Sequence, residues 1–177
     1  MKTSAIPGTD GSPAADAVSE AGFKAAIRQV AASVAVVTAS SGSARNGLTA
    51  TSVCPVALAP PTLLVCVNEH EPALPAMMAS GAFAVNFLSE SQHGIARLFS
   101  TAKLSARARF AKGRWTMLET GSPVLEGTVA SFDCRLERFI SHASHNLLLG
   151  RVVATTVLDE SALLHRDGLF RRLAPMI

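Results

Sequence analysis

The chain has 177 residues, of which 49% are hydrophobic and 16% are charged, and its formal net charge is +3. This length suits one domain with a substantial core, and so apolar a composition excludes a disordered protein. No apolar run reaches the roughly 20 residues that span a bilayer, and no apolar segment precedes Pro7. The sequence therefore predicts neither a membrane segment nor a signal peptide, and its apolar surplus predicts a homodimer whose interface covers hydrophobic surface.

Cys54, Cys66 and Cys134 form no Cys-x-x-Cys pair and leave one cysteine over. This count indicates reduced, cytoplasmic thiols, and we expect all three to be buried as small apolar groups. Basic residues cluster between residues 103 and 114 without a nucleic-acid motif. We expect a solvated basic face or a contact for phosphorylated small molecules there, and no nucleic-acid binding.

The first third of the chain predicts a tail, a helix and a hairpin. Residues 1–18 lack periodicity and predict a flexible tail before a domain over residues 19–177. Ser19 caps a predicted helix that carries Phe23, Ile27 and Val30 on one face, which we expect to lie on the core. A β-branched strand over residues 33–40 then leads through a turn over residues 42–47 into a partner strand over residues 48–53.

The middle of the chain alternates strands with short helices. The run after Pro60-Pro61 predicts a buried central strand over residues 62–67, and residues 72–80 predict a helix that ends at Gly81. Residues 83–87 alternate as a strand with one core face. Ser89 and Gln92 then form a capping box before a helix with apolar residues at helical spacing.

The last third predicts a long basic loop over residues 100–122, anchored by Phe110 and Trp115, and then strands over residues 128–138 and 146–158. A final short strand follows within residues 163–173. The strands do not alternate regularly with helices, so we expect a mostly β fold: an antiparallel, six-stranded barrel with two or three peripheral helices.

The segment from Gly47 to Ser52 carries only small or short side chains apart from Leu48, which leaves backbone N–H and C=O groups available to a flat ligand with polar edges. Gly42 and Gly47 have the glycine spacing of a phosphate loop, but Leu48 stands where the lysine is needed. A Gly-x-Gly-x-x-Gly motif is also missing from the sequence. Neither a phosphate loop nor a Rossmann dinucleotide site is therefore expected.

His142 and His145 lie in the connection between the last two long strands. Their spacing would suit a metal, but no third ligand is evident and we predict no metal site. Each histidine could instead be a structural residue with satisfied hydrogen bonds, or lie at the mouth of a ligand site and donate a hydrogen bond or proton.

In several blocks the sequence resembles the short-chain flavin reductases of two-component flavin monooxygenases, over about residues 20 to 173. The blocks lie in one order at compatible spacings. They are residues 34–38 (VAVVT), 47–52 (GLTATS), 60–68 (PPTLLVCVN), 80–88 (SGAFAVNFL) with Gln92 and Phe99, Arg109-Phe110 with Trp115, residues 121–127 (GSPVLEG) and Cys134.

This resemblance implies a homodimeric split barrel of the FMN-binding type, with FMN or FAD between the subunits and NADH or NADPH stacked on the flavin. It also implies that reduced flavin diffuses to a partner monooxygenase. By the resemblance, His145 is the catalytic histidine beside the nicotinamide and the flavin. The cofactor-binding residues that it implies are Thr49, Ala50, Thr51, Ser52, Val67, Asn68, Gln92 and His145.

The sequence departs from the family pattern near this site. Ala143-Ser144 replaces Gly-Asp before His145, and Phe170 replaces a frequent tyrosine. Glu69 and Glu71 follow Asn68, where two acidic groups are unfavourable near a flavin phosphate unless they point away. Two alternatives therefore stay open: a flavin-binding protein without reductase activity, and a flavoprotein that reduces another acceptor such as a corrinoid or a ferric complex.

Overall fold

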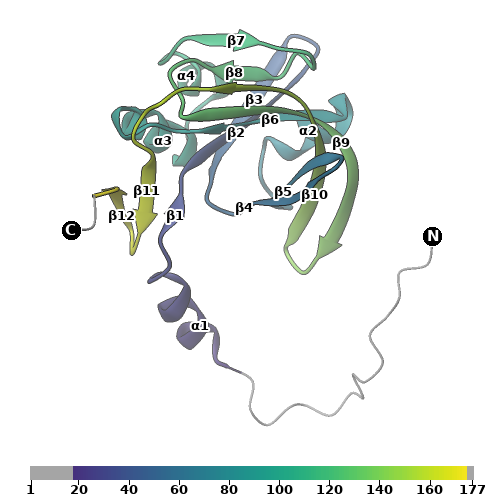
Figure 1. The fold of residues 1–177 in the computed structure, drawn as a ribbon. Coiled ribbons are helices and arrows are strands. Elements are labelled where there is room, and N and C mark those ends of the chain that lie inside the picture. Colours follow the sequence, from purple (N-terminus) through teal and green to yellow (C-terminus); the bar gives the residue numbers. More distant parts are fainter. Residues whose placement is uncertain (1–17, 175–177) are drawn as a thin grey trace, which may run out of the picture.

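A curled sheet of seven antiparallel strands forms the centre of the computed structural model, which describes residues 18–174 (Figure 1). The tail predicted over residues 1–18 lies, except for Val18, outside the described residues. In pairing order the strands are β3 (Ala44–Ala50), β2 (Ala35–Ser41), β6 (Ala82–Phe87), β9 (Ala130–His142), β10 (His145–Val157), β5 (Pro61–Asn68) and β4 (Val53–Leu58).

The edge strands of this sheet, β3 and β4, are consecutive in sequence, with only Thr51 and Ser52 between them. A flat sheet of this size would hold its edges about 29 Å apart, at about 4.8 Å per strand spacing. The chain from Ala50 to Val53 spans at most about 11 Å. The sheet must therefore curl until its edges approach at Thr51 and Ser52, although no backbone pairing joins β3 to β4 within residues 18–174.

The mostly β, antiparallel architecture is confirmed, but the count of six strands is wrong. The additional strand is β4, which contains Pro55 and whose register with β5 shifts between Pro55 and Ala57. Proline is tolerated at sheet edges and bulges because a missing N–H costs no ladder hydrogen bond there. The proline in this segment is therefore the reason that the sequence did not predict this edge strand.

The first hairpin turns at Gly42 and Ser43, not over the whole of residues 42–47. Ser41 pairs with Ala44, and Gly42 has a φ of 59°, a left-handed conformation that suits glycine in a two-residue hairpin turn. Asn46 and Gly47 consequently lie inside β3.

Strands β2 and β6 are buried on both faces. In β2, Val36 and Val37 point to opposite faces, and both are fully buried. In β6, the face predicted to be exposed carries Asn86, which is also fully buried. Its amide donates to Val36 O at 3.0 Å, and its carbonyl accepts from Leu125 N at 2.9 Å, so burial leaves this side chain satisfied.

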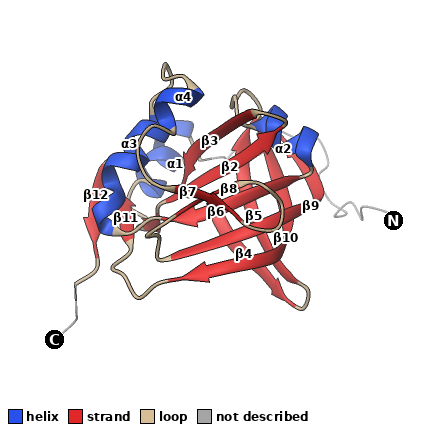
Figure 2. Cartoon of the chain, turned by 90° about the horizontal axis from the view of Figure 1, so that it is seen from above, coloured by secondary structure: helices blue, strands red, loops and turns tan. Residues whose placement is uncertain are grey.

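Short helices cover the ends of the curled sheet. In Figure 2, α3 (His93–Ser100) lies at the same end as β11 (Leu163–Arg166) and β12 (Leu169–Arg172), and α2 (Leu74–Ser80) lies at the other. The predicted capping box is confirmed: Ser89 and Gln92 close the 3₁₀ turn η1 (Glu90–Gln92) ahead of α3. The predicted end of α2 at Gly81, with a φ of 64°, is also confirmed.

The segment predicted as a loop over residues 100–122 contains α4 (Ala106–Arg109) and β7 (Trp115–Met117), which pairs with β8 (Pro123–Leu125). Phe110 anchors it as predicted, buried against Phe99 and Trp115 with ring centroids 5.0 and 4.7 Å away. The solvated basic face is wrong for Arg109, which is buried.

The C-terminal segment forms the β11–β12 hairpin instead of one strand, and β1 (Ala32–Ser33) pairs with β11. At the other terminus, helix α1 (Glu20–Ile27) and its cap are confirmed, since Ser19 Oγ accepts from Gly22 N at 3.1 Å. However, α1 projects away from the sheet (Figure 1) and leaves Phe23 63% exposed, so the expected packing on the core is wrong.

Cys134 is buried as expected, Cys66 is half-buried, and Cys54 is exposed, which contradicts the prediction for that residue. Across residues 18–174, none of the helices has the length and apolar character needed to cross a membrane.

Candidate functional site

A cavity of about 560 Å³ lies between the edge strand β3 and the β11–β12 hairpin. Three residues predicted to bind the flavin, Thr49, Ala50 and Thr51, line it together. The other lining residues come from β11 and β12, the turn between them, α3 and the residue between β1 and β2: Val34, Arg97, Ser100, His165, Gly168, Leu169 and Phe170.

Strand β3 presents open backbone groups on this side. The Gly47 carbonyl accepts a hydrogen bond from Arg109 Nη1 at 2.7 Å, so it points away from the neighbouring strand β2. In antiparallel pairing, the N–H and C=O of every second residue face the same side. This alternation puts the N–H and C=O of Thr49 on the same open edge, where a flat ligand with polar edges can accept and donate hydrogen bonds.

Packing, and not a turn, requires glycine at position 47. A Cβ atom at this position would lie 2.8 Å from Phe99 Cε1 and 2.8 Å from Val37 O, both too close for a real contact. The missing side chain lets α3 approach β3, and Thr49 Oγ1 donates to Ala96 O of α3 at 2.7 Å. The wall of the cavity is therefore a fixed contact between strand and helix.

A second cavity, of about 460 Å³, adjoins the first and shares Thr49 and Ser100 with it. It lies between β3, the α3–α4 connection and the loop that joins β5 to α2. Its other lining residues are Leu48, His70, Glu71, Pro72, Phe99, Ala102 and Arg109. The two cavities therefore adjoin at Thr49 and Ser100, and we refer to the pair as the recess along β3.

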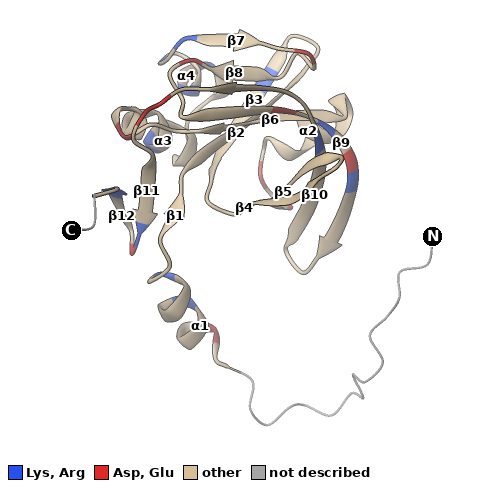
Figure 3. Ribbon diagram, in the orientation of Figure 1, with Lys and Arg blue, Asp and Glu red and all other residues tan. Residues whose placement is uncertain are grey.

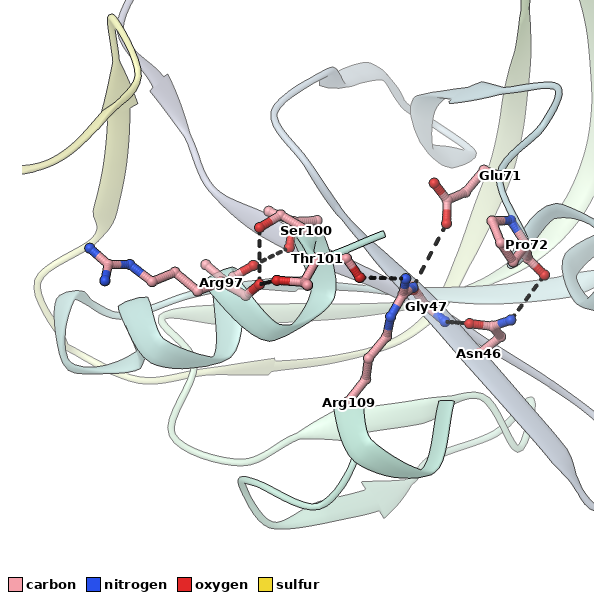
Figure 4. Close-up of polar contacts among 10 residues, drawn as sticks. Asn46, Gly47, Glu71, Pro72, Arg97, Ser100, Thr101 and Arg109 are labelled. Carbon is pink, nitrogen blue, oxygen red and sulfur yellow. Dashed lines mark hydrogen bonds and ion pairs between the residues drawn. The ribbon is translucent and has the colours of Figure 1, made fainter. Parts of the chain in front are cut away.

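A buried cation lines the second cavity. Arg109 is held by the Gly47 carbonyl and by the Thr101 carbonyl, which accepts from Nη2 at 3.1 Å (Figure 4). Glu71 Oε1 lies 3.9 Å from Arg109 Nη1, beyond hydrogen-bonding distance. Burial raises the pKa of Glu71, and the nearby guanidinium offsets only part of that rise. Arginines also occur on α3 and on the β11–β12 hairpin beside the first cavity (Figure 3).

His145 begins β10 and pairs with Asn68 of β5. Its Nδ1 lies 3.0 Å from Ser144 Oγ, so a hydroxyl contacts the ring in place of the carboxylate expected from the family pattern. The turn before it has Ala143 at a φ of 49°, a conformation that glycine adopts without strain. His145 is exposed and lines neither cavity, but Asn68 Oδ1 accepts from His70 N, and His70 lines the second one.

The remaining predicted binding residues line neither cavity. The side chain of Val67 is fully buried in the inner core. Gln92 uses its amide to close the capping box and to donate to Glu126 O at 2.8 Å. Ser52 is exposed, and its carbonyl accepts from Cys66 N. The structure thus brings together Thr49, Ala50 and Thr51, but it does not bring Val67 or Gln92 to them.

Sequence reasoning missed the lining residues on α3 and on the β11–β12 hairpin. Arg97 and Ser100 are three residues apart on the exposed face of α3, opposite the buried Ile95 and Phe99, and this spacing was the available signal. Phe170 of β12 lies beside α3, with the Arg97 guanidinium carbon 5.8 Å from its ring centroid. No cluster of three or more potential metal ligands occurs within residues 18–174.

The structure is a mostly β domain in which a curled antiparallel sheet has an open edge strand beside two adjoining cavities. The chain belongs to the flavin reductase like domain family, whose model matches residues 27–174. A curated relative from Methylorubrum extorquens, an FMN reductase (NADH), is 37% identical over 160 residues, which cover 90% of this chain and 92% of the relative.

Solved structures agree with the family. A putative flavin reductase from Haemophilus somnus superposes with a TM-score of 0.86 at 32% identity, covering 88% of this chain and all of that one. The NADH:FAD oxidoreductase of Streptomyces globisporus superposes with a TM-score of 0.81 at 29% identity, covering 92% of this chain and all of that one.

Proposed function

We propose that the protein is an NAD(P)H-dependent flavin reductase, which transfers a hydride from the nicotinamide to FMN or FAD and supplies reduced flavin to a partner monooxygenase. Membership of the flavin reductase family supports the reaction, and the relatives that are named FMN reductase (NADH) support NADH as the reductant. The observation that carries the proposal is the open edge of β3 along a recess large enough for a flavin.

The residues of the first cavity fit a flavin ring. Thr49 contributes the backbone N–H and C=O of an edge strand, and Ala50 and Thr51 add little bulk. Flavin bound there supplies an acceptor for the hydride of the reduced nicotinamide. Backbone donors fixed by the sheet stabilise negative charge on a bound ring without having to reorganise. The chain thereby orients the ring and favours its reduced form.

His145 is proposed as the catalytic histidine, held in orientation by Ser144. A hydroxyl contact with Nδ1 restrains the ring without adding a charge. The side chain is exposed beside the loop that lines the second cavity, so it is free to contact a ligand at that end of the recess. Of the other predicted binding residues, Ser52 follows the lining residue Thr51, and Asn68 holds the backbone of the lining residue His70. We retain both as proposed ligand contacts for this reason.

A homodimer with the flavin between its subunits is also proposed. Large apolar side chains remain exposed on strands β4 and β9, including Leu58 at 92%, Phe139 at 50% and Ile140 at 49%. A monomer gains nothing from such exposure, and a subunit interface would cover it. The three free cysteines are consistent with our proposal of a cytoplasmic location.

The reaction is tested by following NADH absorbance with purified protein and catalytic FMN in air. We expect flavin-dependent oxidation of NADH far above that with flavin alone, and a reduced kcat for His145→Ala. His142→Ala is the matched control, since His142 faces His145 across the same hairpin. Flavin binding without turnover with NADH or NADPH would instead support a flavin carrier.

A further inference from the structure

The second cavity holds a positive charge that is not neutralised by hydrogen bonding to a carboxylate. Arg109 reaches it from the last turn of α4 with a side chain only 5% exposed. Its two hydrogen bonds go to the carbonyls of Gly47 and Thr101, which are neutral acceptors (Figure 4). Two neutral partners leave the full charge of the guanidinium available to an anion in the cavity.

Glu71 is the one carboxylate among the described residues that line this cavity. Its Oε1 is 3.9 Å from Arg109 Nη1, and its side chain is 24% exposed. The carboxylate is close enough to attract the guanidinium but too far to share a proton with it. The attraction of Arg109 only partly offsets the cost of burying the ionised Glu71 carboxylate. Glu71 and Arg109 are therefore not an optimised ion pair.

Arg109 and Glu71 line the cavity next to the proposed site of the flavin ring. The two cavities share Thr49 and Ser100, so a flavin whose ring lies beside Thr49 can extend its ribityl phosphate into the cavity that Arg109 lines. A phosphate there is attracted by Arg109 and repelled by Glu71. The same carboxylate that partners the arginine therefore opposes the ligand.

We infer that Glu71 sets the affinity for flavin nucleotides: its carboxylate competes with the flavin phosphate for Arg109 and so weakens binding. The inference rests on the proposed function, since it assumes that a flavin occupies the recess. Weak binding suits a reductase whose product must leave to reach a second enzyme. Glu71 in this way promotes release of the reduced flavin.

Equilibrium dialysis or fluorescence titration with oxidised FMN and riboflavin tests the inference, since riboflavin has the same ring and no phosphate. We expect Glu71→Gln to bind FMN about tenfold more tightly, a change of about 1.4 kcal/mol, and riboflavin unchanged. Glu69→Gln is the control, because Glu69 is an exposed carboxylate two residues away that pairs with His70. It should leave both affinities unchanged.

An unchanged or weaker affinity of Glu71→Gln for FMN would overturn the inference, as would an equal gain for riboflavin. If Glu71→Gln does not fold, the affinities of the wild-type protein test the inference. Wild-type binding of FMN more than about 100-fold tighter than binding of riboflavin would overturn it, because Arg109 would then attract the phosphate without opposition. Binding of oxidised flavin needs no turnover. If the wild type reduces flavin but Glu71→Gln does not bind FMN more tightly, only this inference is refuted. If Glu71→Gln binds FMN more tightly but the wild type does not reduce flavin, only the proposed reductase activity is refuted.

Discussion

Arg109 Nη1 lies 2.7 Å from the carbonyl oxygen of Gly47, a residue 62 positions earlier in the chain. The same guanidinium reaches the Thr101 carbonyl, so one side chain joins α4, the end of α3 and strand β3. The two groups that it binds flank the recess in which a flavin is proposed. A single buried cation thus ties strand β3 to α4 and to the end of α3 beside the second cavity.

Replacing Arg109 with methionine should lower the free energy of unfolding by about 3 kcal/mol, because two buried carbonyls lose charged donors. Urea unfolding followed by circular dichroism measures the change. Arg107→Met, on the same helix but exposed, is the matched control and should change stability little. Equal losses for the two variants would show that the Arg109 hydrogen bonds contribute nothing specific.

Gly47→Ala should destabilise the protein by about 2 kcal/mol, because the added methyl meets the Phe99 ring and the Val37 carbonyl at 2.8 Å. Thermal unfolding is a sufficient measurement. Gly94→Ala in α3 is the control: its new methyl meets only the flexible end of Lys112, and alanine favours the helix. A Gly47→Ala protein as stable as wild type would contradict the packing role assigned to this glycine.

Most of the fold followed from local patterns in the sequence. The capping box at Ser89, the left-handed glycine at position 81 and the β-branched run of β2 each depend on neighbouring residues alone. Strand β4 did not follow, because Pro55 is compatible with a strand only at a sheet edge, and edge position is a tertiary property. The exposure of α1 is likewise set by what the rest of the chain leaves uncovered.

The candidate site was only partly predictable for the same reason. Small residues at Thr49, Ala50 and Thr51 indicated accessible backbone, and they do line the recess. Arg109 stood in a basic cluster whose ordinary interpretation is a solvated surface, and nothing local shows that the carbonyl of Gly47 draws it inward. The sequence showed that a carboxylate at Glu71 is unfavourable near a flavin phosphate. The structure places this carboxylate beside Arg109, a cation whose position could not be predicted from the sequence.

The cysteines should differ sharply in reactivity. Burial raises the pKa of the Cys134 thiol to about 12, with a smaller contribution from Asp133, whereas Cys54 is exposed on β4. Iodoacetamide at about pH 8 should therefore label Cys54 in the native protein and leave Cys134 unmodified until denaturant is added. Peptide mass spectrometry reads both sites, and early labelling of Cys134 would contradict its placement in the core.

The titration of Glu71 should be visible in stability. Its pKa in the folded protein is raised above the ordinary value of 4.5, so the folded state binds the proton more tightly than the unfolded state does. The resulting stability is fully present below about pH 4.5 and is lost as the pH rises through the folded pKa. Glutamine has no such titration. The stability of the wild type relative to Glu71→Gln should therefore increase as the pH falls from about 7 to about 4.

Urea unfolding of the two proteins at several pH values measures that difference and cancels the titration of every other group. Near pH 7, where Glu71 is ionised at a partly buried position, glutamine should be the more stable residue, and its advantage should vanish in acid. The opposite slope would mean that attraction to Arg109 outweighs burial. Glu71 would then be a stabilising partner of the arginine, and its carboxylate would be less available to oppose a phosphate.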